Sequence, residues 1–283
     1  MIISASRRTD IPAFYGEWFV NRIREGEVWV RNPMNPKSIS KISLDPAYVE
    51  CIVFWTKNPA NFIPYLEKIE KAGHRYYFQF TLNPYDDDIE PNIDKNKAVE
   101  TFITLSKLIG REKVIWRYDP IIVNSKYTAA YHSSSFRTLC EKLAAYTEKC
   151  VISFVDNYSF LSGVFKESGI KELDDSQIEE IANSISVIAK EYGVPLAACS
   201  EKIDLAKYGI GANKCVDNEL INRLFNLNIK YKKDPGQRPA CACAAGRDIG
   251  SYNTCGHNCV YCYAMRGKRG ALPAGDPASP LLC

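Results

Sequence analysis

Short apolar runs that alternate with amphipathic segments constrain the fold of this chain more than any other feature. Each run is rich in β-branched or aromatic residues and is followed by a polar turn and a segment with helical periodicity. Because the runs are apolar throughout rather than alternating, they predict parallel strands that are covered on both faces. The predicted strands lie at residues 2–6, 51–56, 76–82, 114–119, 151–156 and 195–200.

The segments between these runs predict helices, as at residues 59–72 and 175–192, the latter with an acidic first turn. This β/α order favours an α/β protein with a parallel (β/α) barrel or partial barrel, TIM-like, over residues 1–200. An open doubly wound sheet is the alternative. No Gly-rich phosphate loop follows the first run to support a nucleotide-binding version of it.

Beyond Cys199 the sequence becomes rich in Gly, Asn, Pro and Cys. We expect residues 201–270, with a helix near 219–228, to form a cysteine-rich, cluster-binding segment packed on the barrel mouth. The Pro- and Ala-rich tail at 271–283 is typical of a disordered segment.

Charge and hydropathy bear on the location of the protein in the cell and on its partners. The formal net charge is only +3, without a long run of like charges, so a nucleic-acid partner is neither required nor excluded. No apolar run approaches the roughly 18 residues that span a bilayer, and the opening MIISASRRTD lacks a signal-peptide core. We therefore expect a soluble, cytoplasmic protein without a membrane partner.

Polar side chains gather where the predicted strands end. In a parallel barrel these ends face one mouth, where active sites lie. Any single one of them could instead be a helix cap, a solvated turn or half of an ion pair. The candidate catalytic residues are Arg8, Asp10, Lys57, Arg117, Asp119 and Glu201, and the candidate cofactor contacts at strand ends are Asn58 and Thr81.

The chain has eleven cysteines, and a reducing compartment disfavours structural disulfides, so they point to metal or redox chemistry. Cys51, Cys140 and Cys150 are scattered among apolar residues and read as buried small hydrophobes.

Cys255, Cys259 and Cys262 form a Cys-x-x-x-Cys-x-x-Cys triplet. Thiolates this closely spaced on a loop can converge on one iron–sulfur cluster. Three protein ligands leave one iron of a four-iron cluster open, whereas a purely structural centre is more naturally closed by four. The triplet therefore favours a catalytic centre.

The segment CGHNCVYC, with the aromatic Tyr261 before its last cysteine, resembles the signature of the radical S-adenosylmethionine superfamily. The resemblance implies that the three cysteines hold a [4Fe–4S] cluster whose open iron binds S-adenosylmethionine. It implies that an electron from the cluster cleaves this cofactor to a 5′-deoxyadenosyl radical. It also implies a full or partial (β/α) barrel, an electron donor such as a flavodoxin or ferredoxin, and a backbone contact from Tyr261 to the adenine.

The superfamily motif normally follows the first strand, whereas here it lies in the last third of the chain, as in a circularly permuted barrel. The chain has no Gly-Gly-Glu stretch, and Glu201 or Asp119 could take its place at the methionine amino group. Nearly the whole chain also resembles an uncharacterised bacterial family of unknown function, through ISASRRTDIPAFY, FWTKNP, CSEKIDL, KCVD and QRPACACAAGRDIGSYNTCGHNCVYCYA.

A second possible set of ligands consists of Cys199, Cys215, Cys241 and Cys243. Four thiolates could close a second iron–sulfur cluster or a structural zinc, although Cys199 and Cys215 could equally be buried thiols. Zinc is the alternative for all the C-terminal cysteines. His257 could then be a further ligand or a polar loop residue.

Two classes of function follow. The first is a radical S-adenosylmethionine enzyme that acts on an unknown substrate in the barrel mouth. The second is an iron–sulfur or zinc module with a redox, structural or nucleic-acid-binding role, because RRTD, WTKN and MRGKRG mix basic and aromatic residues. A DNA-repair lyase would lie between the two.

Overall fold

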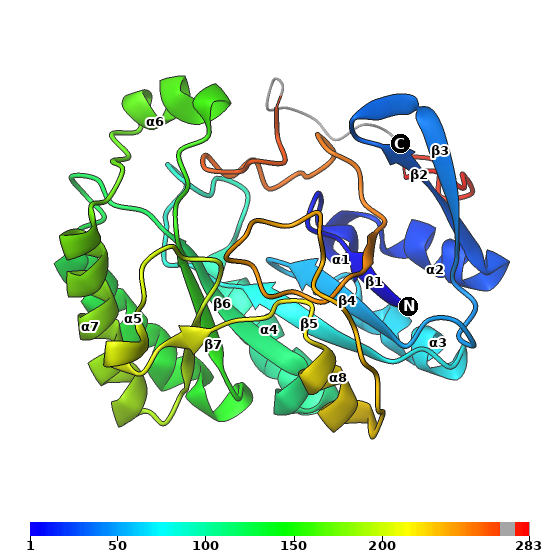
Figure 1. The fold of residues 1–283 in the computed structure, drawn as a ribbon, viewed down its shortest axis with the longest axis horizontal. Helices are drawn as coiled ribbons and strands as arrows, with labels where there is room; N and C mark the ends of the chain where they lie inside the picture. Colours follow the sequence, from blue (N-terminus) through cyan, green and yellow to red (C-terminus); the bar gives the residue numbers. More distant parts are fainter. Residues whose placement is uncertain (267–274, 283) are drawn as a thin grey trace.

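The computed structural model describes residues 1–266 and 275–282, which form an eight-stranded sheet, a two-stranded hairpin and flanking helices (Figure 1). The strands of the sheet are β1 (Ile2–Ala5), β4 (Cys51–Thr56), β5 (Tyr76–Thr81), β6 (Val114–Ile121), β7 (Cys150–Phe154), β8 (Leu196–Ala198), β9 (Gly211–Ala212) and β10 (Arg247–Asp248). The hairpin consists of β2 (Glu27–Asn32) and β3 (Asn35–Ser43).

The α-helices are α1 (Ile11–Phe14), α2 (Gly16–Glu25), α3 (Leu66–Lys71), α4 (Lys95–Ile109), α5 (Ala129–Leu143), α6 (Ser162–Glu167), α7 (Asp175–Glu191) and α8 (Asn218–Phe225). Short 3₁₀ helices are η1 (Ile63–Tyr65), η2 (Arg111–Lys113), η3 (Ala144–Tyr146), η4 (Ser159–Leu161) and η5 (Ala206–Tyr208). Within residues 1–266 and 275–282, none of the helices combines the length and apolar character needed to cross a membrane.

The sheet is parallel throughout, in the order β10-β1-β4-β5-β6-β7-β8-β9. Strands β1 and β4 to β8 lie where the apolar runs predict them, so the parallel α/β fold is confirmed. The order ends at β10 and β9, which do not pair with each other in the described part of the chain, so the sheet is not shown as a closed barrel.

Both faces of the sheet are buried, by different parts of the chain. On β4, Ile52 and Phe54 pack in one cluster with residues of α4, α5 and α7. Cys51 and Val53, on the opposite face of β4, pack in a second cluster with α8 and the segment around Cys241. In Figure 1 the gold and orange C-terminal segments cross the sheet on the side away from α5 and α7. Burial on both faces explains why the strands are apolar throughout.

Local signals set the helix ends. Asp174 caps α7 and forms a capping box with Gln177, so this helix matches the predicted 175–192 closely. The helix predicted at 59–72 is shorter, because Pro64 lies in the opening η1 turn and α3 begins only at Leu66. The helix predicted near 219–228 ends at Asn226, whose φ of 51° is left-handed.

The C-terminal residues 275–282 are packed, which corrects the expectation of a disordered tail for this part of 271–283. Trp18 Nε1 donates to the carbonyl of Ser279 at 3.0 Å, and the amide of Trp29 donates to the carbonyl of Pro280 at 2.9 Å. Leu282 is buried in the core. Hydrogen bonds from a side chain of α2 and from the backbone of β2 thus hold a segment whose composition alone predicts disorder. Residues 271–274 and 283, like 267–270 of the predicted cap, lie outside the described residues.

Candidate functional site

A cavity of about 760 Å³ opens at the carboxyl edge of the sheet. Its walls come from the ends of the strands and from the C-terminal segment, so residues far apart in sequence meet there. The predicted residues that line it are Arg8, Lys57, Thr81, Arg117, Asp119 and Tyr261, together with Cys199, Cys215, Cys241, Cys243 and Cys262. The cavity therefore receives thiols from both cysteine sets.

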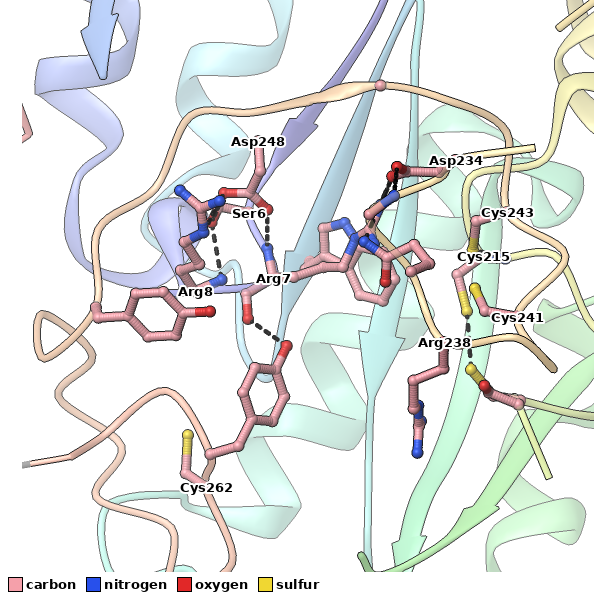
Figure 2. A pocket seen from close by; sticks show the side chains of 18 of the residues that line it. Ser6, Arg7, Arg8, Cys215, Asp234, Arg238, Cys241, Cys243, Asp248 and Cys262 are labelled. Carbon is pink, nitrogen blue, oxygen red and sulfur yellow. Dashed lines mark hydrogen bonds and ion pairs between the residues drawn. The ribbon is translucent and has the colours of Figure 1, made fainter. Parts of the chain in front are cut away.

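The two cysteine sets reach the cavity from different sides. Figure 2 shows Cys215, Cys241 and Cys243 gathered together, whereas Cys262 lies apart from them, on the side of Arg8. This separation means that the thiols belong to two distinct groups.

The loop that carries the triplet is hydrogen-bonded to the segment between β5 and α4. The amide of Val260 donates to the carbonyl of Ile89 at 2.9 Å, and Asn92 Nδ2 donates to the carbonyl of Gly256 at 2.8 Å. Cys259 is buried, whereas Cys255 and Cys262 are half-buried. The loop is thus held firmly while Cys262 faces the cavity.

Glu90 is a buried carboxylate that links this loop to the strand ends. It accepts from Lys57 Nζ at 2.7 Å and from Asn83 Nδ2 at 3.1 Å, and it also contacts Lys95 and the Tyr261 hydroxyl. Burial alone would raise the pKa of Glu90, but Lys57 and Lys95 lower it to about 2. Despite its burial, Lys57 beside Glu90 has its pKa raised to about 12. Both groups are therefore charged at neutral pH.

Asp248, at the end of β10, ties the C-terminal segment to β1 (Figure 2). Its carboxylate accepts from the hydroxyls of Ser4 and Ser6 at 3.1 and 2.7 Å. It also accepts from the amides of Arg7 at 2.8 Å and Gly250 at 3.0 Å. One side chain thus fixes the start of the cysteine-bearing loop against the carboxyl end of the first strand.

Ion pairs and aromatic rings position the cationic side chains of the cavity. Arg7 lies 4.0 Å from Asp234, and Arg8 lies 3.8 Å from Asp248. The guanidinium groups of Arg7 and Arg117 lie 5.6 and 5.1 Å from the ring centroid of Trp55. The basic residues at the strand ends are therefore held in place and still line the cavity.

Asp10 and Asn58 are strand-end residues that do not line the cavity. Asp10 caps α1 and accepts from the amide of Lys57 at 2.7 Å and from His257 Nε2 at 2.8 Å. Asn58 Oδ1 accepts from the amide of Ala60 at 3.1 Å. Both side chains satisfy nearby backbone or loop groups, and Asp10 contacts the triplet loop through His257.

Glu201 does not line the cavity either, and its carboxylate accepts from the amide of Phe154 at 3.0 Å. Burial raises the pKa of Glu201 to about 7. Asp119 does line the cavity and is paired with Arg117 and the hydroxyl of Ser153.

The remaining cysteines divide as expected. Cys51, Cys140 and Cys150 are fully buried in apolar clusters, which confirms their interpretation as core residues. Cys199 Sγ and Cys215 Sγ, by contrast, are 3.3 Å apart. Hydrogen bonds from the Cys199 and Cys243 thiols, aided by Arg117, hold the pKa of Cys215 well below its usual value.

The chemistry of the triplet fits an iron–sulfur group. Its donors are soft thiols on one short loop. In the same loop, His257 Nδ1 and Asn258 Oδ1 are buried and have no hydrogen-bond partner among the described residues. Among residues 1–266 and 275–282, no three Cys, His, Asp or Glu side chains are already arranged to hold a metal ion.

A family model described as a domain of unknown function (DUF1848) matches residues 2–264. This chain belongs to that family. The match spans the sheet of the DUF1848 protein and its cysteine triplet, and it ends before the packed tail at 275–282. A search of curated proteins found no match to the sequence.

Sequence reasoning missed Glu90 and Asp248, two carboxylates that organise the site of this DUF1848 protein. Glu90 lies in the acidic stretch DDDIEPN, where nothing local separates it from solvated neighbours. Asp248 ends a two-residue strand that has no apolar run. The position of Asp248 was the available signal, because its RDIG segment lies between the Cys-x-Cys pair and the triplet.

Proposed function

We propose that this protein is an iron–sulfur enzyme of the radical S-adenosylmethionine type that acts on an anionic substrate. The observation that carries the proposal is that a Cys-x-x-x-Cys-x-x-Cys loop is docked at the carboxyl edge of a parallel sheet. There Cys262 and Tyr261 line the same cavity as Lys57 and Arg117.

The sheet order supports a permuted partial barrel. Strand β10 pairs in parallel with β1, and the triplet loop leaves from the carboxyl end of β10. The loop thus follows the edge strand of the sheet, as the superfamily motif follows its first strand. A late position in the sequence is compatible with an early position in the fold.

Cys255, Cys259 and Cys262 would hold the cluster. When bound, a [4Fe–4S] cluster with S-adenosylmethionine supplies an electron and, through reductive cleavage of the cofactor, a radical able to abstract hydrogen. The chain's own part is to position and shield the reactants. Glu90 and Lys57 fix the Tyr261 hydroxyl, and the buried Val260 backbone anchors the loop to Ile89.

Cationic side chains outnumber carboxylates on the cavity wall. The cations are Arg7, Arg8, Arg31, Lys57, Arg117, Arg238 and Arg247, and the carboxylates are Asp119, Asp156, Asp234 and Asp248. Because a positive wall attracts negative ligands, this excess favours an anionic substrate, the cofactor carboxylate, or both.

Metal analysis of anaerobically purified protein tests the proposal. We expect about four irons and four sulfides per triplet cluster, with a paramagnetic signal after reduction. Replacing Cys255, Cys259 or Cys262 by Ala should abolish that signal while leaving the far-UV circular dichroism nearly unchanged. Cys140→Ala is the matched control, because Cys140 is buried in α5 and packs in the helix-side core.

A colourless protein that contains zinc and no iron would contradict this proposal and favour the module alternative. So would three Ala variants that all retain the wild-type signal.

A further inference from the structure

Four thiols meet at the end of the cavity opposite Cys262. They come from three separate segments: Cys199 follows β8, Cys215 follows β9, and the Cys241/Cys243 pair precedes β10. All four line the cavity; Cys215, Cys241 and Cys243 are buried, and Cys199 is half-buried. Four thiols from distant positions in the chain thus gather in one place.

Two of these sulfurs accept several hydrogen bonds. Cys215 Sγ accepts from Arg117 Nη1 at 2.9 Å and from Asn213 Nδ2 at 3.1 Å. Cys243 Sγ accepts from the amides of Cys215 at 3.3 Å and Val216 at 3.5 Å. A neutral thiol is a weak acceptor, so a converging set of donors, one of them a guanidinium, is typical of the hydrogen bonds that support metal-binding thiolates.

The distances fit metal binding better than a disulfide. Cys199 Sγ and Cys215 Sγ are 3.3 Å apart, well beyond the roughly 2.05 Å of an S–S bond. Around a tetrahedral zinc with Zn–S distances near 2.3 Å, two sulfurs lie about 3.8 Å apart. Small side-chain rotations would therefore open the group around an ion.

We propose that Cys199, Cys215, Cys241 and Cys243 form a second metal centre with four thiolate ligands, either a zinc ion or an iron–sulfur cluster. The set is closed, since four thiolates leave no coordination position for a cofactor. Its location joins the ends of β8 and β9 to the segment that leads into β10. The centre thus links the cysteine-rich segment to the ends of β8 and β9. This inference does not depend on the proposed function of the triplet.

The test uses full-length protein in which Cys255, Cys259 and Cys262 are all replaced by Ala, so that only the second set remains. After anaerobic purification we expect about one zinc, or about four irons with sulfide, per chain. Adding Cys241→Ala and Cys243→Ala should remove that metal, whereas adding Cys140→Ala should leave it. Zinc without sulfide and iron with sulfide both support the centre and distinguish its two forms.

A metal-free triple variant that stays folded by circular dichroism, and that gives no thiolate-to-cobalt absorption when the reduced protein is titrated with Co²⁺, would overturn the inference. A Cys199–Cys215 disulfide in metal-free protein would overturn it as well. Because the triplet is absent from every sample, failure of the radical enzyme proposal leaves these outcomes unchanged.

Discussion

Glu90 is a buried carboxylate that connects the triplet loop to a strand end and to a helix. Glu90 is 1% exposed and meets Lys57 from the end of β4, Lys95 from α4 and Tyr261 from the loop. A buried charge keeps its ionised form only when its partners remain in place, so removing one partner leaves the others uncompensated.

The pKa of Glu90 gives a prediction of acid sensitivity. Its folded-state pKa of about 2 lies below the ordinary 4.5, so its contribution is complete above pH 4.5 and is lost as the pH falls toward 2. We expect Glu90→Gln to lower the free energy of unfolding by on the order of 3 kcal/mol at pH 7. The difference from wild type should shrink between pH 4.5 and 2 in urea unfolding experiments.

The exposed pair of Glu67 and Lys71 is the matched control, since both side chains are 74% exposed. Glu67→Gln should change stability by less than about 1 kcal/mol. Equal effects of the two substitutions, at all pH values, would show that the Glu90 network is not a stabilising contact.

Strand β10 attaches the cysteine-rich segment to the sheet by pairing with β1. It is two residues long, and its hold on β1 depends on Asp248 and on the close approach of Gly250. A Cβ added at Gly250 would lie 2.0 Å from Ser6 Oγ and 2.6 Å from Ser6 Cβ, which is too close for the loop to stay where it is.

We therefore expect Gly250→Ala to displace the loop, lowering the free energy of unfolding by about 1–3 kcal/mol and reducing the iron content of the triplet. Thermal unfolding and iron analysis of the same preparation measure both effects. Gly163→Ala is the control, because Gly163 lies in α6 with no atom within 4 Å of an added Cβ. If the two variants bind iron equally well and melt together, the docking of β10 does not position the cluster loop.

The sequence predicts strands β1 and β4 to β8 of the sheet, but it does not predict the β2–β3 hairpin. The difference has a physical reason. Strands buried on both faces must be apolar throughout, and that pattern is visible without the fold. The β3 segment NPKSISKIS is mostly exposed and lacks such a pattern, so the hairpin was not predicted.

For the site, the Cys-x-Cys pair at 241 and 243 stands out in the sequence, but only the structure brings it together with Cys199 and Cys215. The direction in which a strand-end side chain points could not be predicted from the sequence. Asp10 and Lys57 both follow strands, yet local capping turns Asp10 toward backbone amides while the partners of Lys57 hold it at the cavity. Such choices depend on contacts between residues far apart in the chain.

At the scale of the whole molecule, the proposed activity rests on a parallel sheet, a cysteine loop at its carboxyl edge and a cavity lined by more cations than carboxylates. The most direct measurement is chromatography of an anaerobic, dithionite-reduced mixture of the protein with S-adenosylmethionine. We expect 5′-deoxyadenosine above the level of the Cys255→Ala variant, together with a change in the cluster's paramagnetic spectrum when the cofactor is added. Iron-loaded protein that gives neither product nor spectral change would contradict the proposed activity.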